Sequence, residues 1–205
     1  MLTDFHTHSS TYSPDAVISL EPSRAEEFMA LYSEAHASTG IHPWNTENEP
    51  DWDLLERVAA MPRIVAIGEC GLDLLRGAPI DRQTDIFRRH IELSERMGKP
   101  MIIHCVKAWD VLLALKKKMK PRQKWGIHGY RGGPEQARQL TAHGIYLSLG
   151  EYFNQDTATV IPHELLLAET DECHKPISTI IAGISRHTAE EWDPALNLYR
   201  FLQQI

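Results

Sequence analysis

The chain has 205 residues and carries 21 Lys and Arg against 28 Asp and Glu, which gives a formal net charge of −7. This length suits one domain, spanning residues 1–205, and the acidic balance argues against strong non-specific binding to a long polyanion. No apolar run reaches the roughly 18–20 residues of a membrane span, and the N-terminus lacks the basic flank and apolar core of a signal peptide. We therefore expect a cytoplasmic protein with no membrane contact and no obligate protein partner.

Short apolar runs alternate with amphipathic stretches along most of the chain. The runs are rich in β-branched and large apolar residues and end beside polar residues, which is typical of buried parallel strands. In chain order, the expected elements are a strand at 4–8, a helix at 51–60, a strand at 64–67, a helix at 81–98, a strand at 100–104, a helix at 109–119, a strand at 125–128, a helix at 134–142, strands at 144–149 and 164–168, and two closing helices within 177–205. This alternation predicts an α/β fold with right-handed crossovers, but it does not by itself distinguish a barrel from an open sheet.

Histidine is frequent, at 11 of 205 residues, and two histidines stand in the first expected strand. His6 and His8 are two residues apart, so an extended backbone directs both side chains to one face. Two imidazoles placed in this way can hold one divalent ion. Because many such pairs are incidental, this one needs support from elsewhere in the chain.

That support comes from four later strands, which end at or beside residue types that bind metals. Glu69 stands between Gly68 and Gly71, which permit a sharp turn and a close backbone approach, and its two carboxylate oxygens can bridge two ions. Any one of these residues alone is more often structural, but the C-terminal strand ends of a (β/α) barrel converge at one mouth. The sequence therefore predicts two adjacent metal sites bridged by Glu69, formed by His6, His8, Glu69, His104, His128 and Asp171.

A site of this kind predicts hydrolysis. Two divalent ions about 3.5–4 Å apart activate water at neutral pH and stabilise the attacking and leaving oxygens of a displacement; we expect Mg²⁺, Mn²⁺ or Zn²⁺. Asp171 is the candidate for taking a proton from the water, and Glu69 is the second catalytic candidate. The loop 129–133 offers backbone amides and the Arg131 guanidinium, and both suit a phosphate.

These residues lie in motifs that resemble those of the TatD family of metal-dependent hydrolases, within the amidohydrolase-like group. The segments follow the order of the family: DFHTH at 4–8, GIHPW at 40–44, AIGECGLD at 66–73, KPMIIHC at 99–105, IHGYRGG at 127–133, YLSLGEYFN at 146–154 and LLLAETDE at 165–172. The resemblance implies a distorted TIM-type barrel of seven or eight mostly parallel strands, divalent ions, and deoxyribonuclease or related phosphodiesterase activity. It supports the same six metal ligands and adds His42 and Asp73 as candidates for binding substrate or supporting a ligand.

The sequence departs from the family pattern in two places. Only residues 9–39 separate His8 from Gly40, whereas two complete βα units need about 30 residues each. We therefore expect the first helix and much of the second unit to be trimmed, leaving a barrel open on one side. In addition, Gly129-Tyr130-Arg131 stands where the family more often has a Cys-Phe-Ser type of sequence, which alters the expected substrate pocket.

Three functions remain compatible with these residues. The first is a two-metal phosphodiesterase, with a small phosphoester or a nucleic-acid end as its substrate. The second is an amidohydrolase that cleaves a C–N or ester bond, because the same activated water attacks a carbonyl carbon. The third is a metal-binding module without catalysis, although all six ligand positions are filled. Arg131 and its glycine-rich loop favour the phosphodiesterase.

Overall fold

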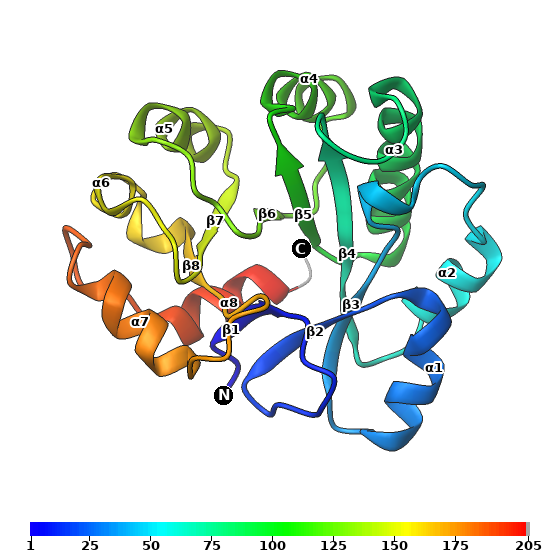
Figure 1. The fold of residues 1–205 in the computed structure, drawn as a ribbon, viewed down its shortest axis with the longest axis horizontal. Helices are drawn as coiled ribbons and strands as arrows, with labels where there is room; N and C mark the ends of the chain where they lie inside the picture. The colour runs from blue at the N-terminus through cyan, green and yellow to red at the C-terminus, as the bar shows by residue number, and fades with distance from the viewer. Residues whose placement is uncertain (204–205) are drawn as a thin grey trace.

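Eight parallel strands form one sheet whose spatial order follows the chain. The computed structural model describes residues 1–203. Its strands are β1 (Asp4–Thr7), β2 (Ala16–Leu20), β3 (His36–Thr39), β4 (Ile64–Asp73), β5 (Met101–Val106), β6 (Trp125–Ile127), β7 (Tyr146–Leu149) and β8 (Leu166–Ala168). Its α-helices are α1 (Pro22–Leu31), α2 (Trp52–Ala59), α3 (Ile80–Met97), α4 (Trp109–Met119), α5 (Pro134–Ala142), α6 (Gln155–Ala158), α7 (Ile177–Ser185) and α8 (Pro194–Leu202), with 3-10 turns at Pro43–Asn45 and His163–Leu165. Figure 1 shows most of the helices outside the curved sheet, which confirms the barrel.

The first and last strands meet, so the expectation of a barrel open on one side is wrong. Thr7 and Asp171 form a parallel β-bridge. The His8 amide donates to the Asp171 carbonyl at 3.1 Å, and the Asp171 amide donates to the His6 carbonyl at 2.9 Å. The segment after β8 therefore continues the sheet far enough to reach β1. This closure also places Asp171 directly beside the paired histidines.

The early part of the barrel is shortened in a different way from the one expected. No helix occurs in residues 8–15 between β1 and β2, as predicted. The second unit is nevertheless present, because β2, α1 and β3 all fit within residues 16–39. They fit because the strands have only four or five residues and α1 has ten. Compared with two complete βα units, this part of the barrel therefore lacks the helix between β1 and β2 and has short elements in β2, α1 and β3.

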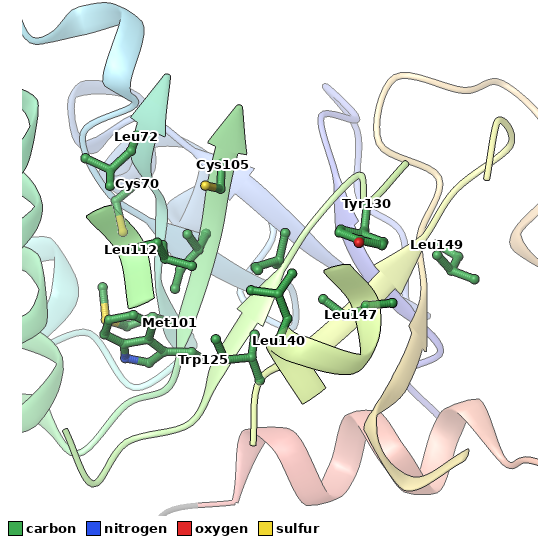
Figure 2. Close-up of a cluster of buried hydrophobic side chains, with 14 of the residues drawn as sticks. Cys70, Leu72, Met101, Cys105, Leu112, Trp125, Tyr130, Leu140, Leu147 and Leu149 are labelled. Carbon is green, nitrogen blue, oxygen red and sulfur yellow. The ribbon is translucent and has the colours of Figure 1, made fainter. Parts of the chain in front are cut away.

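Alternate strand residues face two separate cores. Outward side chains such as Met101 and Trp125 pack against the helices, and Figure 2 shows them with Leu112 of α4. Inward side chains such as Ile102 join Phe5 inside the barrel. With both faces buried, the strands have nearly continuous apolar sequences instead of alternating ones.

Helix α8 covers the end of the barrel opposite to the C-terminal strand ends. Phe201 lies edge-on to Phe5 of β1 and to Tyr146 at the start of β7, with both ring centroids at 5.2 Å. The two closing helices predicted within 177–205 are α7 and α8, and the apolar side chains on the buried face of α8 are Leu198 and Phe201. Among residues 1–203, no helix combines the length and the hydropathy that crossing a bilayer requires.

Candidate metal centre

Strand periodicity carries ligand residues from the barrel interior to its mouth. Ile102 and Leu167 face the interior core, and His104 and Glu169 follow two residues later on the same faces. Gly126 also faces inward, because a Cβ atom there would lie 2.6 Å from the Phe5 ring. His128 follows it by two residues, so each of these three chain segments projects a polar side chain above the apolar interior.

Glu69 reaches the centre from an irregular part of β4. The register between β4 and β5 shifts between Ile67 and Cys70. Gly68 (φ 148°) and Gly71 (φ 146°) lie so close to β5 that a Cβ atom would be 2.2 Å and 2.0 Å from carbonyl oxygens of that strand. Only glycine permits this conformation and this approach. The two glycines expected to shape the turn around Glu69 therefore do so.

One oxygen of Glu69 faces the N-terminal histidines. Oε2 lies 3.3 Å from Nε2 of His6 and 3.2 Å from Nε2 of His8. Oδ1 of Asp171 is 3.9 Å and 3.7 Å from the same two nitrogens. His6, His8 and Asp171 thus form one group of candidate metal ligands, on the Oε2 side of Glu69.

The other oxygen of Glu69 faces a second group of histidines. Oε1 lies 2.9 Å from Nδ1 of His104, 2.8 Å from Nε2 of His128 and 2.9 Å from Nε2 of His42. His42, which the motif resemblance placed only near the site, is therefore as close to Glu69 as the predicted ligands are. The carboxylate divides the centre into two halves, one on each oxygen.

The donor set suits divalent cations. Nε2 atoms of His6 and His8 are 3.2 Å apart, as are Nδ1 of His104 and Nε2 of His128. Neutral imidazoles in such pairs aim nitrogen lone pairs at a shared space, which a proton or a metal ion must occupy. Imidazole and carboxylate donors together match Zn²⁺ and Mn²⁺, and carboxylates also match Mg²⁺. The residues present fit a divalent-metal centre, with candidate ligand groups on both oxygens of Glu69.

Burial and neighbouring charges shift the pKa values of Glu69 and His128 in opposite directions. Burial would raise the pKa of Glu69, but the charge of His128 and hydrogen bonds from His104, His128 and His42 hold that pKa well below its usual value. Burial would lower the pKa of His128, but the Glu69 and Glu169 carboxylates raise it well above its usual value. The pKa of His6 is lowered, first by its complete burial and then by the charge of His128. The carboxylates thus attract positive charge to a centre whose inner groups, Glu69 and His6, are buried.

Two buried carboxylates contact candidate ligand histidines on the side of the ring that faces away from Glu69. Asp73, a candidate for supporting a ligand or binding substrate, is 3% exposed. Its Oδ2 lies 3.2 Å from Nε2 of His104 and accepts from Nε1 of Trp44 at 2.6 Å. Glu169 faces Nδ1 of His128 at 3.5 Å. The contact of Asp73 with His104 favours a proton on Nε2 of that ring, and Glu169 places a negative charge beside His128. The role of Glu169 was not foreseen, although its position two residues beyond an inward-facing leucine would have indicated it.

Asp4, two residues before His6, links β1 to the segment that follows β8. Its carboxylate accepts from the Thr170 amide at 3.0 Å and from the Thr170 hydroxyl at 2.6 Å. Burial raises the pKa of Asp4 to about 7. The contact ties β1 to the turn that carries Asp171, whose φ of 53° is tolerated by aspartate better than by most residues.

A cavity of about 460 Å³ opens over the centre and includes His8, His42, Glu69, His104, His128 and Asp171 in its wall. Trp44 is 44% exposed and forms part of one wall of this cavity. Arg24, from α1, lines the same cavity and is exposed. Sequence reasoning missed Arg24 because no motif marks it and its helix was expected to be trimmed.

The 129–133 loop does not offer its first amides to a ligand. The Gly129 amide donates to Oε1 of Glu169 at 2.5 Å, and the Tyr130 amide donates to the Ser148 carbonyl at 3.0 Å. Arg131 is exposed and lines a neighbouring cavity instead of the one over the centre. These two amides are therefore engaged within the protein, and phosphate binding by the rest of the loop and by Arg131 stays a prediction.

Comparison with known proteins agrees with this geometry. The chain is 32% identical over 159 residues to a *Bacillus subtilis* protein named uncharacterized metal-dependent hydrolase YabD, covering 72% of this chain and 62% of that protein. It is 27% identical over 166 residues to the 3'-5' ssDNA/RNA exonuclease TatD of *Escherichia coli*, covering 74% of this chain and 63% of that protein. The chain thus spans less than two thirds of the length of these curated relatives.

Solved structures match the fold more completely. The *Escherichia coli* TatD homologue YjjV superposes with a TM-score of 0.77 at 20% identity, covering 98% of this chain and 95% of that chain. A TatD family hydrolase from *Entamoeba histolytica* gives a TM-score of 0.69 at 19% identity, covering 90% and 81%. The family model described as TatD related DNase matches residues 5–179. The chain therefore belongs to the TatD related DNase family.

Proposed function

We propose that this protein is a divalent-metal-dependent phosphodiesterase that cleaves single-stranded nucleic acid near an end. The observation that carries the proposal is the division of Glu69, with Oε2 at 3.2–3.3 Å from His8 and His6 and Oε1 at 2.8–2.9 Å from His128, His42 and His104. A carboxylate in this position is suited to bridging two ions. The relative named as a 3'-5' ssDNA/RNA exonuclease supports the substrate class.

Each residue has a defined task in the proposed reaction. His6, His8 and Asp171 would hold one divalent ion, His104 and His128 would hold a second, and Glu69 would contribute to both sites; the candidate ions are Mg²⁺, Mn²⁺ and Zn²⁺. When bound, two such ions activate water at neutral pH and neutralise charge that develops on a phosphate. Asp171 has one oxygen directed at His6 and His8 and lines the open cavity. It is the proposed acceptor of the proton that the attacking water releases.

The cavity favours a phosphodiester over an amide. Arg24 supplies a guanidinium, which binds phosphate oxygens with two parallel hydrogen bonds. Trp44 is 44% exposed, with the Arg76 guanidinium 4.4 Å from its ring centroid, and supplies an aromatic side chain against which a nucleobase can pack. A simple amide or carboxylic ester needs neither group. Amide or ester hydrolysis and metal binding without catalysis are therefore the alternative outcomes of the test. The cytoplasmic location of the protein stays a prediction.

A metal-supplemented substrate screen tests the proposal. Purified protein is assayed with Mg²⁺, Mn²⁺ or Zn²⁺ on a short single-stranded DNA, on bis-p-nitrophenyl phosphate, and on p-nitrophenyl acetate and a simple anilide. We expect hydrolysis of the first two substrates, and we expect none with the Glu69→Gln variant, because its amide removes the bridging charge. Elemental analysis should find about two ions per chain in the wild type and fewer in the variant. Turnover confined to the ester or anilide would overturn the proposal, and so would metal-free wild-type protein.

A further inference from the structure

A second cavity of about 360 Å³ adjoins the metal centre on the other side of Asp171. The loops after β6, β7 and β8 form it, whereas the loops after β1, β2 and β3 form much of the cavity over the centre. Asp171 and Glu172 are the two residues that line both cavities. A ligand that extends from the metal centre past Asp171 toward the loops after β6 and β7 would therefore enter the second cavity.

An aromatic ring and a guanidinium lie together in this second cavity. The Tyr152 side chain is 67% exposed, and the guanidinium carbon of Arg131 is 5.5 Å from the centroid of its ring. Within residues 1–203, Arg131 makes no ion pair with an acidic side chain. The two side chains come from different loops, so the backbone alone does not force the contact.

The acidic groups nearest to this pair are largely engaged elsewhere. Glu151 pairs with Lys175 at 2.5 Å and accepts from the Cys173 thiol at 3.0 Å. Glu169 is buried and accepts from the Gly129 amide. Glu172 is exposed to solvent at the boundary between the cavities. The positive charge of Arg131 therefore remains available to an anionic ligand.

We propose that Tyr152 and Arg131 form a nucleotide subsite next to the catalytic centre, an inference that rests on the proposed phosphodiesterase function. Tyr152 stacks on the base of the nucleotide that follows the scissile phosphate past Asp171, and Arg131 contacts that nucleotide's phosphate. Exposed aromatic rings bind unpaired bases by stacking, and arginine adds its planar charge. A duplex keeps its bases stacked on one another, so the subsite selects single strands. A small phosphoester occupies only the cavity over the centre.

Separate substrates distinguish the subsite from the catalytic centre. Tyr152→Ala and Arg131→Ala are compared with wild type on bis-p-nitrophenyl phosphate and on a single-stranded DNA of ten nucleotides. We expect each variant to raise KM for the DNA by about 5- to 150-fold, the range found when one stacked base is lost. On bis-p-nitrophenyl phosphate, kcat/KM should stay within about twofold. Tyr152→Phe, which keeps the ring, should behave like wild type, and Arg131→Lys, which keeps the charge without the planar fork, should fall in between.

Tyr199→Ala is the matched control, because Tyr199 is 59% exposed on α8 at the far end of the barrel. Fluorescence anisotropy of the same labelled DNA, with the metal removed by EDTA, measures binding independently of turnover. A DNA affinity of Tyr152→Ala equal to that of wild type, or equal losses on both substrates, would overturn the subsite. If wild type hydrolyses neither substrate with any of the three metals, the proposed function fails, whereas the anisotropy comparison still decides the subsite.

Discussion

Nε2 of His104 and Oδ2 of Asp73 face each other at 3.2 Å, on the opposite edge of the imidazole ring from Glu69. With a metal ion in the centre in place of the proton that Nδ1 shares with Glu69, the Asp73 carboxylate would favour a proton on Nε2 and leave the Nδ1 lone pair for the ion. Asp73 also accepts from the indole of Trp44, so one buried carboxylate orients a candidate ligand and a wall of the cavity. Of the two roles that the motif resemblance left open for Asp73, this position favours support of a ligand over binding of substrate.

Replacing Asp73 with Ala should weaken metal binding by about 10- to 100-fold, because His104 loses the partner that fixes its ring. Competition with a chromogenic chelator measures the affinity. Trp44→Phe removes only the second hydrogen bond of Asp73 and should leave metal affinity within about threefold of wild type. Wild-type affinity in Asp73→Ala would show that His104 is oriented without the carboxylate.

Arg24 should bind the phosphate of a substrate in the cavity over the centre. Arg24→Ala is expected to raise KM for bis-p-nitrophenyl phosphate by about tenfold, because a hydrogen bond to a charged group contributes about 1.5–3 kcal/mol. Steady-state kinetics at saturating metal provide the measurement, and Arg24→Lys should recover part of the loss. The exposed Arg138, which pairs with Glu135 on α5, supplies an Arg→Ala control. An unchanged KM would remove Arg24 from the substrate site.

His90 should make the protein less stable in mild acid. It is fully buried on α3, where Nε2 accepts from the Ile41 amide at 3.0 Å and Nδ1 donates to the Ile86 carbonyl at 2.9 Å. Burial lowers the pKa of His90 to about 4, whereas the unfolded chain takes up this proton near pH 6.5. Between these values the unfolded state binds more protons, so the stabilisation is complete above about pH 6.5 and is lost as the pH falls toward 4. The loss is on the order of 3 kcal/mol in the free energy of unfolding.

Urea unfolding between pH 7 and 4 measures this dependence. His90→Gln keeps an acceptor for the Ile41 amide but cannot titrate, so its free energy of unfolding should vary less steeply with pH than that of wild type. His143→Gln, a substitution at an exposed histidine on the C-cap of α5, controls for loss of a surface imidazole. Identical slopes for His90→Gln and wild type would show that another group causes the acid sensitivity.

Phe201 should contribute strongly to stability without taking part in the chemistry. It is fully buried between Phe5 and Tyr146 at the end of the barrel away from the metal centre. Phe201→Ala should lower the free energy of unfolding by about 3–5 kcal/mol, the usual cost of such a cavity. Urea unfolding at pH 7 tests this, with Phe201→Leu expected to cost less. A change below about 1 kcal/mol would mean that α8 does not close the barrel core in solution.

The regular part of the fold was predictable from local patterns. The helices expected at 109–119 and 134–142 match α4 and α5 residue for residue. In both stretches the apolar periodicity and the residues at the ends indicate the same helix boundaries. Strand β8 begins at Leu166, later than expected, because residues 163–165 form a 3-10 turn. The elements β2, α1 and β3 were missed, because very short strands around a weakly amphipathic helix leave little periodicity to read.

The sequence by itself determined which residues gather at the barrel mouth. Side-chain alternation along a strand and the convergence of parallel strand ends are general rules, so they bring His6, His8, Glu69, His104, His128 and Asp171 together without any distance being known. Only the tertiary structure decided how these residues are divided between the two oxygens of Glu69. It also decided that Asp171 closes the barrel on Thr7, and that Arg24 and Arg131 face different cavities. These features depend on contacts between loops far apart in the chain, and no local pattern encodes such contacts.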